Sequence, residues 1–230
     1  MNRQVGLRQE LQIVANNIAN MTTTGFRKEG LIFSEYVHAM DSGAPSLSMA
    51  RASARTTDLG QGALTQTGGQ FDLAIEGSGF FLIETPDGNR LTRAGAFTPN
   101  DAGELVTPDG FRLLDNGAAP VFIPPDARVV SIASDGTLSA DDRALGQIGL
   151  FAPADPSELA RQNGQMFRAD AGVEPAEGGA MLQGFLEGSN VNAIAEITRL
   201  IEVQRAYEAS QKLLDQEHER IRSVMQTLGK

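Results

Sequence analysis

The sequence predicts an α+β fold in which an N-terminal and a C-terminal helix pair as a coiled coil, with a mainly β domain, sandwich- or barrel-like, inserted between them. Apolar residues recur with a helical period at both ends of the chain, and the C-terminal pattern runs over residues 191–228 without Gly or Pro. Turn-forming residues divide the middle of the chain into short apolar runs, which is typical of β-strands.

The N-terminal helix is predicted from apolar residues that share one face. They are spaced alternately four and three residues apart: Leu7, Leu11, Val14, Ile18 and Met21. This average spacing of about 3.5 residues is the coiled-coil value, and Gly25 is expected at the C′ position that ends the helix. An amphipathic helix packed only on its own domain would show the same pattern, so that alternative stays open.

The C-terminal helix is predicted from a longer seam. One residue in every seven belongs to it: Ala193, Leu200, Tyr207, Leu214, Ile221 and Leu228. Val203 adds an apolar residue at an intervening position, whereas Ser210 interrupts the seam. As a helix, residues 191–228 would extend over about 57 Å, which exceeds most globular helices and favours a coiled coil. Ser189 or Asn190 is expected to cap its N-terminus, with Asn192 nearby.

Between these helices the chain is predicted to form short strands. Pro86-Asp87-Gly88-Asn89 should join strand 80–84 to strand 90–97 as a hairpin, because Pro presets φ and Gly accepts positive φ. Further strands are expected at residues 71–75, 104–107, 111–114, 120–123, 128–133, 137–139 and 147–151. Residues 153–180 are expected to be loop with little regular structure.

The predicted organisation has four parts. They are an N-terminal helix of an axial core (1–30), an extended linker (31–60), an inserted β-rich domain (61–188) and a long C-terminal helix of the core (189–230). Two paired helices have little core of their own, so their remaining apolar faces must be buried against neighbouring copies. The sequence therefore predicts a self-assembling protein.

The net charge of −10 is carried by the middle of the chain. Residues 31–190 contain 21 acidic and nine basic side chains, whereas residues 1–30 contain two acidic and four basic ones and residues 191–230 contain six of each. An acidic middle between nearly neutral ends argues against binding to nucleic acid or to anionic lipid.

Composition also limits the chemistry. The chain has no Cys, and its two His residues, His38 and His218, are far apart in the sequence. No apolar stretch approaches the ~18–20 residues of a transmembrane helix, and the N-terminal sequence lacks the apolar region of a cleavable signal peptide. We therefore expect no cofactor, no metal and no membrane insertion. The location is expected to be the cytoplasm, or a site reached by export without such a signal.

An enzyme is disfavoured because no catalytic constellation is present. Asp141 and Asp142 are adjacent and so rarely converge on one site, and Gly77-Ser78-Gly79 lacks the spacing of a nucleophile elbow. The Asp-rich turns lack the twelve-residue spacing of a calcium loop. A secreted β-rich binding module is the rival interpretation; it would explain the middle of the chain but not the paired helices.

Four motifs, which follow one another along the chain, resemble those of one family. They are Ala15-Asn16-Asn17-Ile18-Ala19-Asn20 with Thr24-Gly25-Phe26, Ile75-Glu76-Gly77-Ser78-Gly79-Phe80-Phe81, Leu91-Thr92-Arg93-Ala94-Gly95-Ala96-Phe97, and Ser189-Asn190-Val191-Asn192 with Gln204-Arg205-Ala206-Tyr207-Glu208. Over nearly the whole chain, the sequence resembles the bacterial flagellar rod and hook proteins. Its short length is similar to that of the proximal rod proteins, and distal rod or hook-type proteins are the alternatives within the family.

The resemblance implies a structural subunit of the flagellar basal-body rod, the drive shaft that transmits motor torque. In that family the terminal helices form a coiled coil that lines an axial tube, and the β domain faces outward. Subunits stack helically with copies of themselves and with other rod proteins. They are exported unfolded through the flagellar type III apparatus without a cleaved signal peptide, so the implied location is the rod that spans the periplasm.

The predicted assembly residues combine the apolar seams with the polar residues of the terminal motifs. They are Leu7, Leu11, Val14, Asn16, Asn17, Ile18, Asn20, Gly25, Phe26, Asn190, Asn192, Leu200, Val203, Gln204, Arg205, Tyr207, Leu214 and Ile221. The three Asn residues of the first motif are poor helix formers, so they are expected to bond to the backbone or to a neighbouring subunit, or simply to end the helix. The hydroxyl of Tyr207 is expected to have a partner. Arg205 is expected to pair with Glu208 within the helix, or across subunits in an assembly.

Overall fold

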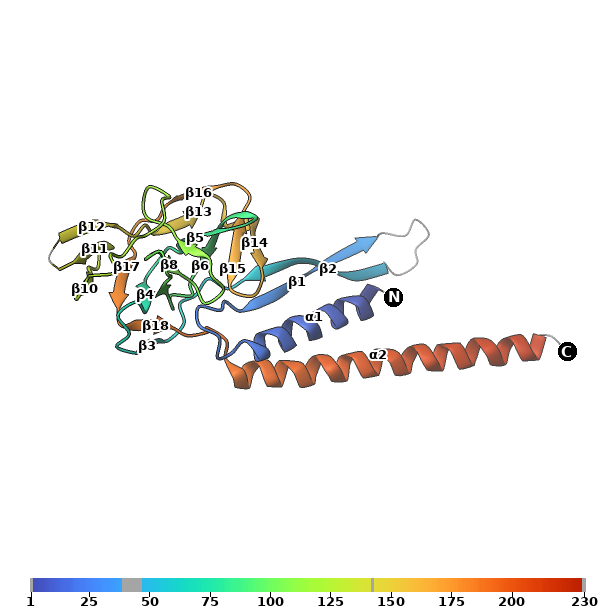
Figure 1. Cartoon of the computed structure of the whole chain (residues 1–230). Helices are drawn as coiled ribbons and strands as arrows, with labels where there is room; N and C mark the ends of the chain where they lie inside the picture. The colour runs from blue at the N-terminus through green and yellow to red at the C-terminus, as the bar shows by residue number, and fades with distance from the viewer. Residues whose placement is uncertain (1, 39–46, 142, 229–230) are drawn as a thin grey trace. The chain divides into compact units, whose positions relative to one another are not determined.

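A computed structural model of the chain describes residues 2–38, 47–141 and 143–228. Within these residues the chain forms an N-terminal helix, a mainly β middle and a C-terminal helix, so the predicted α+β class is confirmed. Figure 1 shows this order along the chain. Part of the predicted linker, at residues 39–46, lies outside the described residues.

The described chain divides into two compact units, and each unit is discontinuous in sequence. The helical unit comprises Met1–Asn20, Lys28–Asp58 and Val191–Lys230. The β-rich unit comprises Met21–Arg27 and Leu59–Asn190. The chain therefore passes from one unit to the other four times, and the N-terminal motif itself is shared between them.

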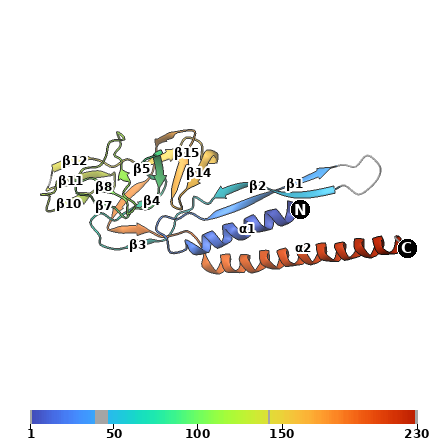
Figure 2. The same ribbon diagram turned by 45° about the vertical axis from the view of Figure 1, so that its right-hand side comes forward.

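Within the described residues, the helical unit consists of an antiparallel pair of helices and a β-ribbon. α1 (Asn2–Ala19) packs on α2 (Ala193–Leu228), and the ribbon of β1 (Glu29–His38) and β2 (Leu47–Thr57) packs on α1. Figures 1 and 2 both show α1 between the ribbon and α2. Because α2 has 36 residues and α1 has 18, the C-terminal part of α2 extends past α1.

The ribbon differs from the extended linker predicted over residues 31–60. β1 and β2 are antiparallel, with Glu29 opposite Thr57 and a register shift after Ile32. β1 has the β-branched and aromatic residues of a strand, but β2 is rich in Ser, Ala, Arg and Thr. Such a strand is hard to recognise by itself, because its stability depends on the partner with which it pairs.

The β-rich unit is built from open sheets. Among the described residues, the largest sheet has seven strands in the order β14, β15, β6, β5, β9, β8 and β7. Its strands are β5 (Phe81–Thr85), β6 (Gly88–Thr92), β7 (Thr98–Pro99), β8 (Leu105–Val106), β9 (Arg112–Leu113), β14 (Leu159–Gln162) and β15 (Met166–Ala169). The end strands β14 and β7 are not paired with each other, so the described residues form no closed barrel.

Smaller antiparallel sheets complete this unit. One contains β10 (Val130–Ile132), β11 (Thr137–Ala140) and β12 (Arg143–Gln147), with β11 in the centre. The other pairs are β13 (Phe151–Pro153) with β16 (Val173–Pro175), β17 (Ala180–Gln183) with β4 (Leu73–Glu76), and β18 (Phe185–Glu187) with β3 (Leu64–Gln66). A short 3₁₀ helix, η1 (Pro156–Glu158), precedes β14.

The predicted hairpin is confirmed, although its second strand is shorter than expected. β5 and β6 are antiparallel, with Thr85 opposite Gly88. Gly88 has a φ of +101°, which is the conformation that the turn motif predicted for it. β6 ends at Thr92 instead of continuing to residue 97, and Ala96 makes an isolated bridge to Asp72.

Residues 153–180, predicted to be loop, contain paired strands. Leu159 of β14 lies opposite Ala169 of β15, and β15 joins the large sheet through β6. The turn between them contains Asn163 and Gly164, both at positive φ, so the loop signals mark the turn between strands. Two further strands differ from the prediction: residues 147–151 are divided between β12 and β13, and residues 120–123 make only isolated bridges.

The core of the β-rich unit is divided between two clusters of apolar side chains. Phe81 and Leu105 are fully buried in the larger cluster, where the rings of Phe81 and Phe97 meet edge to face with centroids 5.3 Å apart. Phe80 and Phe167 belong to the smaller cluster. Since successive residues of a strand point to opposite faces, the apolar run that begins at Phe80 serves both clusters.

The cap of α2 differs from the prediction. The side-chain oxygen of Asn192 accepts a hydrogen bond from the main-chain N–H of Ala195 at 3.1 Å, so Asn192 is the N-cap rather than Ser189 or Asn190. Over their described residues, neither α1 nor α2 combines the length and the apolar character needed to cross a membrane.

The close packing of the β-rich unit can be tested at Gly95. A Cβ at this position would overlap the main-chain carbonyl oxygen of Leu73, whereas a Cβ at Gly146 would meet nothing within 4 Å. We expect Gly95→Ala to lower the free energy of unfolding by about 1–3 kcal/mol through overpacking. Gly146→Ala should change it by less than about 1 kcal/mol. Urea unfolding followed by circular dichroism measures both, and equal effects would show that the contact at Gly95 is not tight.

Candidate assembly interface

The first half of α2 carries the predicted seam. Val203 is buried, and its seam neighbours Leu200 and Tyr207 are half-buried. Glu196, at an intervening position of the same seam, is also buried. The hydroxyl of Tyr207 accepts a hydrogen bond from Nε2 of Gln211 at 3.0 Å, so the predicted partner of this hydroxyl is present.

The buried face of α1 is displaced by one residue from the predicted seam. Its buried residues lie three or four positions apart: Gly6, Glu10, Ile13 and Asn17, with Val14 beside them. The other seam residues of the helix, Leu7, Leu11 and Ile18, are only half-buried. The displacement arises because two polar residues occupy the buried face, and a pattern of apolar residues cannot detect them.

Contacts between the helices show where each part of α1 lies along α2. Near the end of α1, Asn17 bonds to Glu196 in the first turn of α2. Gln4, near the start of α1, lines the same surface pocket as Tyr207. α1 therefore begins opposite the middle of α2 and runs back toward the N-terminus of α2.

Asn17 connects α1 to the start of β1 and to α2. Its side-chain nitrogen donates to the main-chain oxygen of Glu29 at 2.8 Å, and its side-chain oxygen accepts the main-chain N–H of Glu29 at 3.0 Å. The same nitrogen donates to Oε2 of Glu196 at 3.0 Å. Because Asn17 is fully buried, these bonds replace those that its amide would make with water.

The carboxylate of Glu196 is shared between Asn17 and a cation. Its Oε1 lies 2.6 Å from Nζ of Lys28, the residue that precedes β1. We name Asn17, Lys28 and Glu196 the helix joint. A buried carboxylate is stable only when it is paired and hydrogen-bonded, and both conditions are met here.

One turn further along α2, Arg199 binds Glu10 of α1. Nη2 and Nε of Arg199 lie 2.5 and 2.7 Å from Oε1 of Glu10, and Nη1 lies 3.3 Å from Glu202. Partial burial lowers the pKa of Arg199, but hydrogen bonds and charges from Glu10 and Glu202 outweigh this effect and raise the pKa. The guanidinium therefore stays charged and holds the buried carboxylate of Glu10.

The C-terminal half of α2 leaves its apolar residues uncovered. Leu214 and Ile221 continue the heptad position of Leu200 and Tyr207, yet they are 43% and 55% exposed. Further exposed apolar residues on this part of the helix are Leu213, Val224 and Met225. A row of exposed apolar residues at helical spacing is typical of a surface that binds another helix.

A second buried polar cluster lies in the β-rich unit and consists of Arg27, Arg93 and Glu187; we name it the arginine joint. Carboxylate oxygens of Glu187 lie 2.7 Å from Nη1 of Arg27 and 3.1 Å from Nη1 of Arg93. One of them also accepts the main-chain N–H of Gly62 at 2.8 Å. The pKa of Arg93 is lowered because burial disfavours its charged form; Glu187 opposes this effect, and Arg27 adds to it.

Aromatic rings and a third arginine extend the arginine joint. The guanidinium of Arg161 lies between the rings of Phe26 and Phe167, 4.5 and 4.8 Å from their centroids, and it donates to the main-chain oxygen of Arg27. Contacts of this kind contribute about 0.5–2 kcal/mol each. Phe26, a predicted assembly residue, takes part in these contacts and is fully buried inside the β-rich unit.

Gly25 has a role that differs from the predicted one. α1 ends at Ala19, so Gly25 is not the C′ residue of this helix. Its φ is +69°, and an added Cβ would overlap main-chain atoms of Ala94. Its N–H donates to the main-chain oxygen of Glu187 at 2.7 Å. Glycine is needed here because the chain passes close to another backbone in a left-handed conformation.

The remaining Asn residues of the motifs, Asn16, Asn20 and Asn190, bond to other residues of the same chain. Nδ2 of Asn20 donates to the main-chain oxygen of Asn16 at 2.9 Å and to its side-chain oxygen at 3.1 Å, which favours the interpretation that these two residues end the helix. Nδ2 of Asn190 donates to the main-chain oxygen of Gly60 at 2.8 Å. These bonds lie within one chain.

Gln204 and Arg205 of the C-terminal motif are both exposed. Nε2 of Gln204 donates to Oε1 of Glu208 at 3.1 Å, an i, i+4 hydrogen bond on the helix surface. In the described structure this bond takes the place of the predicted pair between Arg205 and Glu208.

Sequence reasoning missed the charged residues that hold the two joints. They are Lys28 and Glu196 of the helix joint, Arg27, Arg93 and Glu187 of the arginine joint, Arg161 beside it, and the neighbouring pair of Glu10 and Arg199. One usable signal was present: Glu10 and Asn17 are seven residues apart, so they share one face of a helix. The contacts of Arg161 with Phe26 and Arg27 could not be read locally, because these two residues are distant from it in sequence.

The two units differ in charge. The β-rich unit contains 18 acidic and eight basic side chains, whereas the helical unit contains eleven of each. The whole net charge of −10 therefore belongs to the β-rich unit. Over the described parts of the chain, no group of three or more His, Asp and Glu side chains is arranged to hold a metal ion.

Family models match successive parts of the chain. The model described as "Flagella basal body rod protein" matches residues 1–27. The model described as "Flagellar hook protein FlgE/F/G D1 domain" matches residues 74–140, and that described as "Flagellar basal body rod FlgEFG protein C-terminal" matches residues 182–227. The outer two matches contain the terminal motifs, and the central one lies in the β-rich unit.

Known proteins are similar to this chain over most or all of its length. The sequence is 40% identical to the flagellar basal-body rod protein FlgF of Caulobacter vibrioides, over 100% of this chain and 96% of that protein. It is 36% identical to FlgF of Mesorhizobium japonicum, over 100% of this chain and 95% of that protein. It is 34% identical to the flagellar basal-body rod protein FlgG of Bacillus subtilis, over 89% of this chain and 88% of that protein.

The helix joint can be tested at Asn17. Replacing it with Ala removes the amide that bonds to Glu29 and Glu196, and an unsatisfied buried polar group costs about 1–3 kcal/mol. Asn16→Ala is the matched control, because Asn16 is exposed and its replacement should change the free energy of unfolding by about 0.5 kcal/mol or less. Urea unfolding followed by the helical circular dichroism signal measures both. If both variants have a similarly small effect on the free energy of unfolding, the hydrogen bonds of Asn17 do not stabilise the helical unit.

The arginine joint can be tested at Glu187. Glu187→Gln leaves two buried guanidinium groups without a carboxylate, and we expect a loss of about 3–5 kcal/mol of stability. Glu84, whose pair with Arg112 is 41% exposed on both sides, serves as the control, and Glu84→Gln should cost about 0–1 kcal/mol. Thermal unfolding compares the two variants. Equal melting temperatures would mean that the buried carboxylate does not stabilise the unit.

Proposed function

This chain belongs to the flagellar basal-body rod protein family, and from that premise we propose that it is a FlgF-type structural subunit that stacks helically into the rod and transmits motor torque. The family is one of structural proteins, and we propose that the chain has no catalytic activity. The observation that carries the proposal is the exposed apolar seam on the C-terminal half of α2.

The apolar residues of this exposed seam have the same seven-residue spacing as those in the half of α2 that packs on α1. Leu200 and Tyr207 lie in the half of α2 that packs on α1 and are half-buried, whereas Leu214 and Ile221, at the same heptad position, are exposed. An apolar heptad seam is buried only when a second helix lies along it. We propose that helices of neighbouring copies cover this half of α2, so that the assembled helices form a coiled-coil layer around an axial tube.

The half-buried residues of α1 are proposed to supply a matching surface. Leu7, Leu11 and Ile18 lie beside the face that contacts the rest of the helical unit, so part of each side chain is free to contact a neighbouring copy. Asn17 and Val203 are buried, and their proposed role is to position the interface rather than to form it. Gly25 and Phe26 have the same positioning role for the segment that follows α1.

The net charge of each unit supports a different proposed position for it in the rod. We propose that the helical unit, with equal numbers of acidic and basic side chains, forms the inner layer. Like charges would repel one another across a tightly packed layer. The acidic β-rich unit is proposed to form the outer wall, where water and salt screen its charge over about 8 Å.

We further propose that the chain is exported through the flagellar type III apparatus and is assembled in the part of the basal body that spans the periplasm. Its proposed partners are copies of itself and other rod proteins. Relatives that are named flagellar basal-body rod proteins support this location. Purified basal bodies should contain the chain, and its absence from them would contradict the proposal.

A FlgG-type subunit is the second candidate, favoured by the similarity to FlgG proteins over most of the chain. Complementation distinguishes the two. The chain should restore motility to a strain of its own organism that lacks the FlgF gene, but not to one that lacks the FlgG gene. The reverse result would favour the second candidate.

The seam can be tested by placing a charge on it. Leu214→Asp puts an unpaired carboxylate into the proposed helix interface, where burying a charge is costly. We expect the variant chain to be exported but not incorporated, with loss of swimming on soft agar and loss of rods in electron micrographs of basal bodies.

Gln216→Asp is the matched control, because it adds the same charge to an exposed position off the seam. Cells with this variant should swim normally. If Leu214→Asp cells also swim normally, the C-terminal half of the seam is not an interface.

A further inference from the structure

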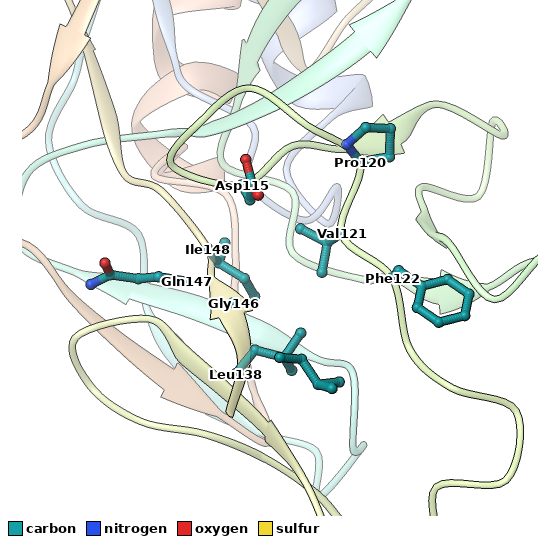
Figure 3. A pocket seen from close by; sticks show the side chains of 9 residues that line it. Asp115, Pro120, Val121, Phe122, Leu138, Gly146, Gln147 and Ile148 are labelled. Atoms are coloured by element: carbon teal, nitrogen blue, oxygen red, sulfur yellow. The ribbon is translucent and has the colours of Figure 1, made fainter. Parts of the chain in front are cut away.

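The β-rich unit contains a small open pocket next to the hairpin of β11 and β12. Its volume is about 140 Å³. Its lining combines apolar side chains with the polar side chains of Asp115 and Gln147; the apolar ones are Pro120, Val121, Phe122, Leu138, Leu145 and Ile148. Figure 3 shows Val121, Leu138 and Ile148 around one common space, with the ring of Phe122 at its side.

The pocket has the size of one apolar side chain. A cavity of about 150 Å³ accepts a benzene molecule, so the volume of this pocket suits one Ile, Leu or Phe side chain, which would pack against the apolar part of the lining. Phe122 and Leu145 at its edge are 49% and 40% exposed. All five residues of β12 are exposed as well, and this strand forms one edge of its sheet. The surface is therefore accessible to another molecule.

The helical unit presents a complementary feature, which we name the isoleucine ridge: Ile194, Ile197 and Ile201 of α2. Ile194 is 79% exposed, and the other two are about half exposed. Spacings of three and four residues place them on one face of the helix. The buried residues Glu196 and Val203 lie on a different face, so packing within the helical unit leaves the ridge free.

Charge decides which part of a second copy fits the pocket. Contact between two β-rich units would bring together two units that each carry an excess of ten acidic groups, and like charges close to an interface are unfavourable. The helical unit has no net charge, and it presents the isoleucine ridge. The matching occupant is therefore the helical unit of another copy.

We infer that Ile194, in the isoleucine ridge of one copy, inserts into the pocket whose edge carries Phe122 and Leu145 on the next copy. This contact rests on the proposed function, because it connects copies of one chain in a polymer. Ridge and pocket are different surfaces of the same chain, so the contact is heterologous. Each copy then offers a free ridge and a free pocket to further copies, and such contacts build an open helical polymer when the rotation between copies does not close a ring.

Engineered cysteines test the contact directly, since the chain has none of its own. An untagged Ile194→Cys chain and an epitope-tagged Leu145→Cys chain are produced together in flagellated cells that lack the wild-type chain. Basal bodies are purified and oxidised, and mixed dimers are identified by size on non-reducing gels. A disulfide requires Cα atoms about 4.4–6.8 Å apart, so a mixed dimer reports direct contact.

Val173→Cys replaces Leu145→Cys in the control pair, because Val173 belongs to the same unit and is 38% exposed. We expect a strong mixed dimer with Leu145→Cys and little with Val173→Cys. Equal yields from basal bodies that contain both chains would overturn the contact while leaving the proposed function intact. A wild-type chain that is absent from basal bodies would overturn the proposed function, and this contact with it.

A second variant tests the pocket without cysteines. Gly146→Phe adds a ring at the pocket wall, at a position where an added Cβ meets no atom within 4 Å. We expect an unchanged melting temperature of the isolated chain and a loss of rod incorporation. Val173→Phe enlarges an exposed side chain elsewhere on the unit and should leave incorporation unchanged. Normal incorporation of the Gly146→Phe chain would overturn the inference.

Discussion

The need to neutralise buried charge is the constraint on which the rest of the structure depends. In the β-rich unit, the carboxylate of Glu187 faces the guanidinium groups of Arg27 and Arg93, all of them buried. Arg27 is the last residue before the chain passes to the helical unit, and Glu187 lies three residues before its final passage. One carboxylate therefore holds together the segments that follow α1 and precede α2. Since charges removed from water are stable only when they are paired, these segments have little freedom to separate.

The helical unit uses the same principle to align its elements. Apolar helix faces can slide past one another at modest cost, but a buried amide or carboxylate must meet its own partner. Asn17 meets the main chain of Glu29 and the carboxylate of Glu196, which aligns α1 with β1 and α2. We interpret these polar contacts as devices that specify register, a role that buried polar residues have in coiled coils. Because polar residues take the buried face of α1, several of its apolar residues stay partly exposed.

Exposure of apolar surface and separation of charge together favour assembly. The helical unit has no net charge and keeps isoleucine and leucine side chains exposed along α2. The β-rich unit has most of the apolar core and the whole net charge. Contacts that bury the helices gain apolar burial without charge repulsion, whereas contacts between β-rich units do not. The chain is thus divided into a part suited to association and a part suited to exposure to solvent.

The sequence by itself determined the α+β class, the two helices, the hairpin at Pro86 and the family, because these features follow from local periodicity, turn chemistry and motif order. Only the tertiary structure decided the buried face of α1, the pairing of β2 with β1, and the partners of Glu187 and Arg161. Each of these depends on residues far apart in the chain. A periodic pattern identifies the positions of apolar side chains, but it does not show which polar side chains are paired. Burial of a charged or amide side chain is favourable only when its hydrogen-bond or charge partner is in place. The buried polar residues could therefore be identified only in the folded chain.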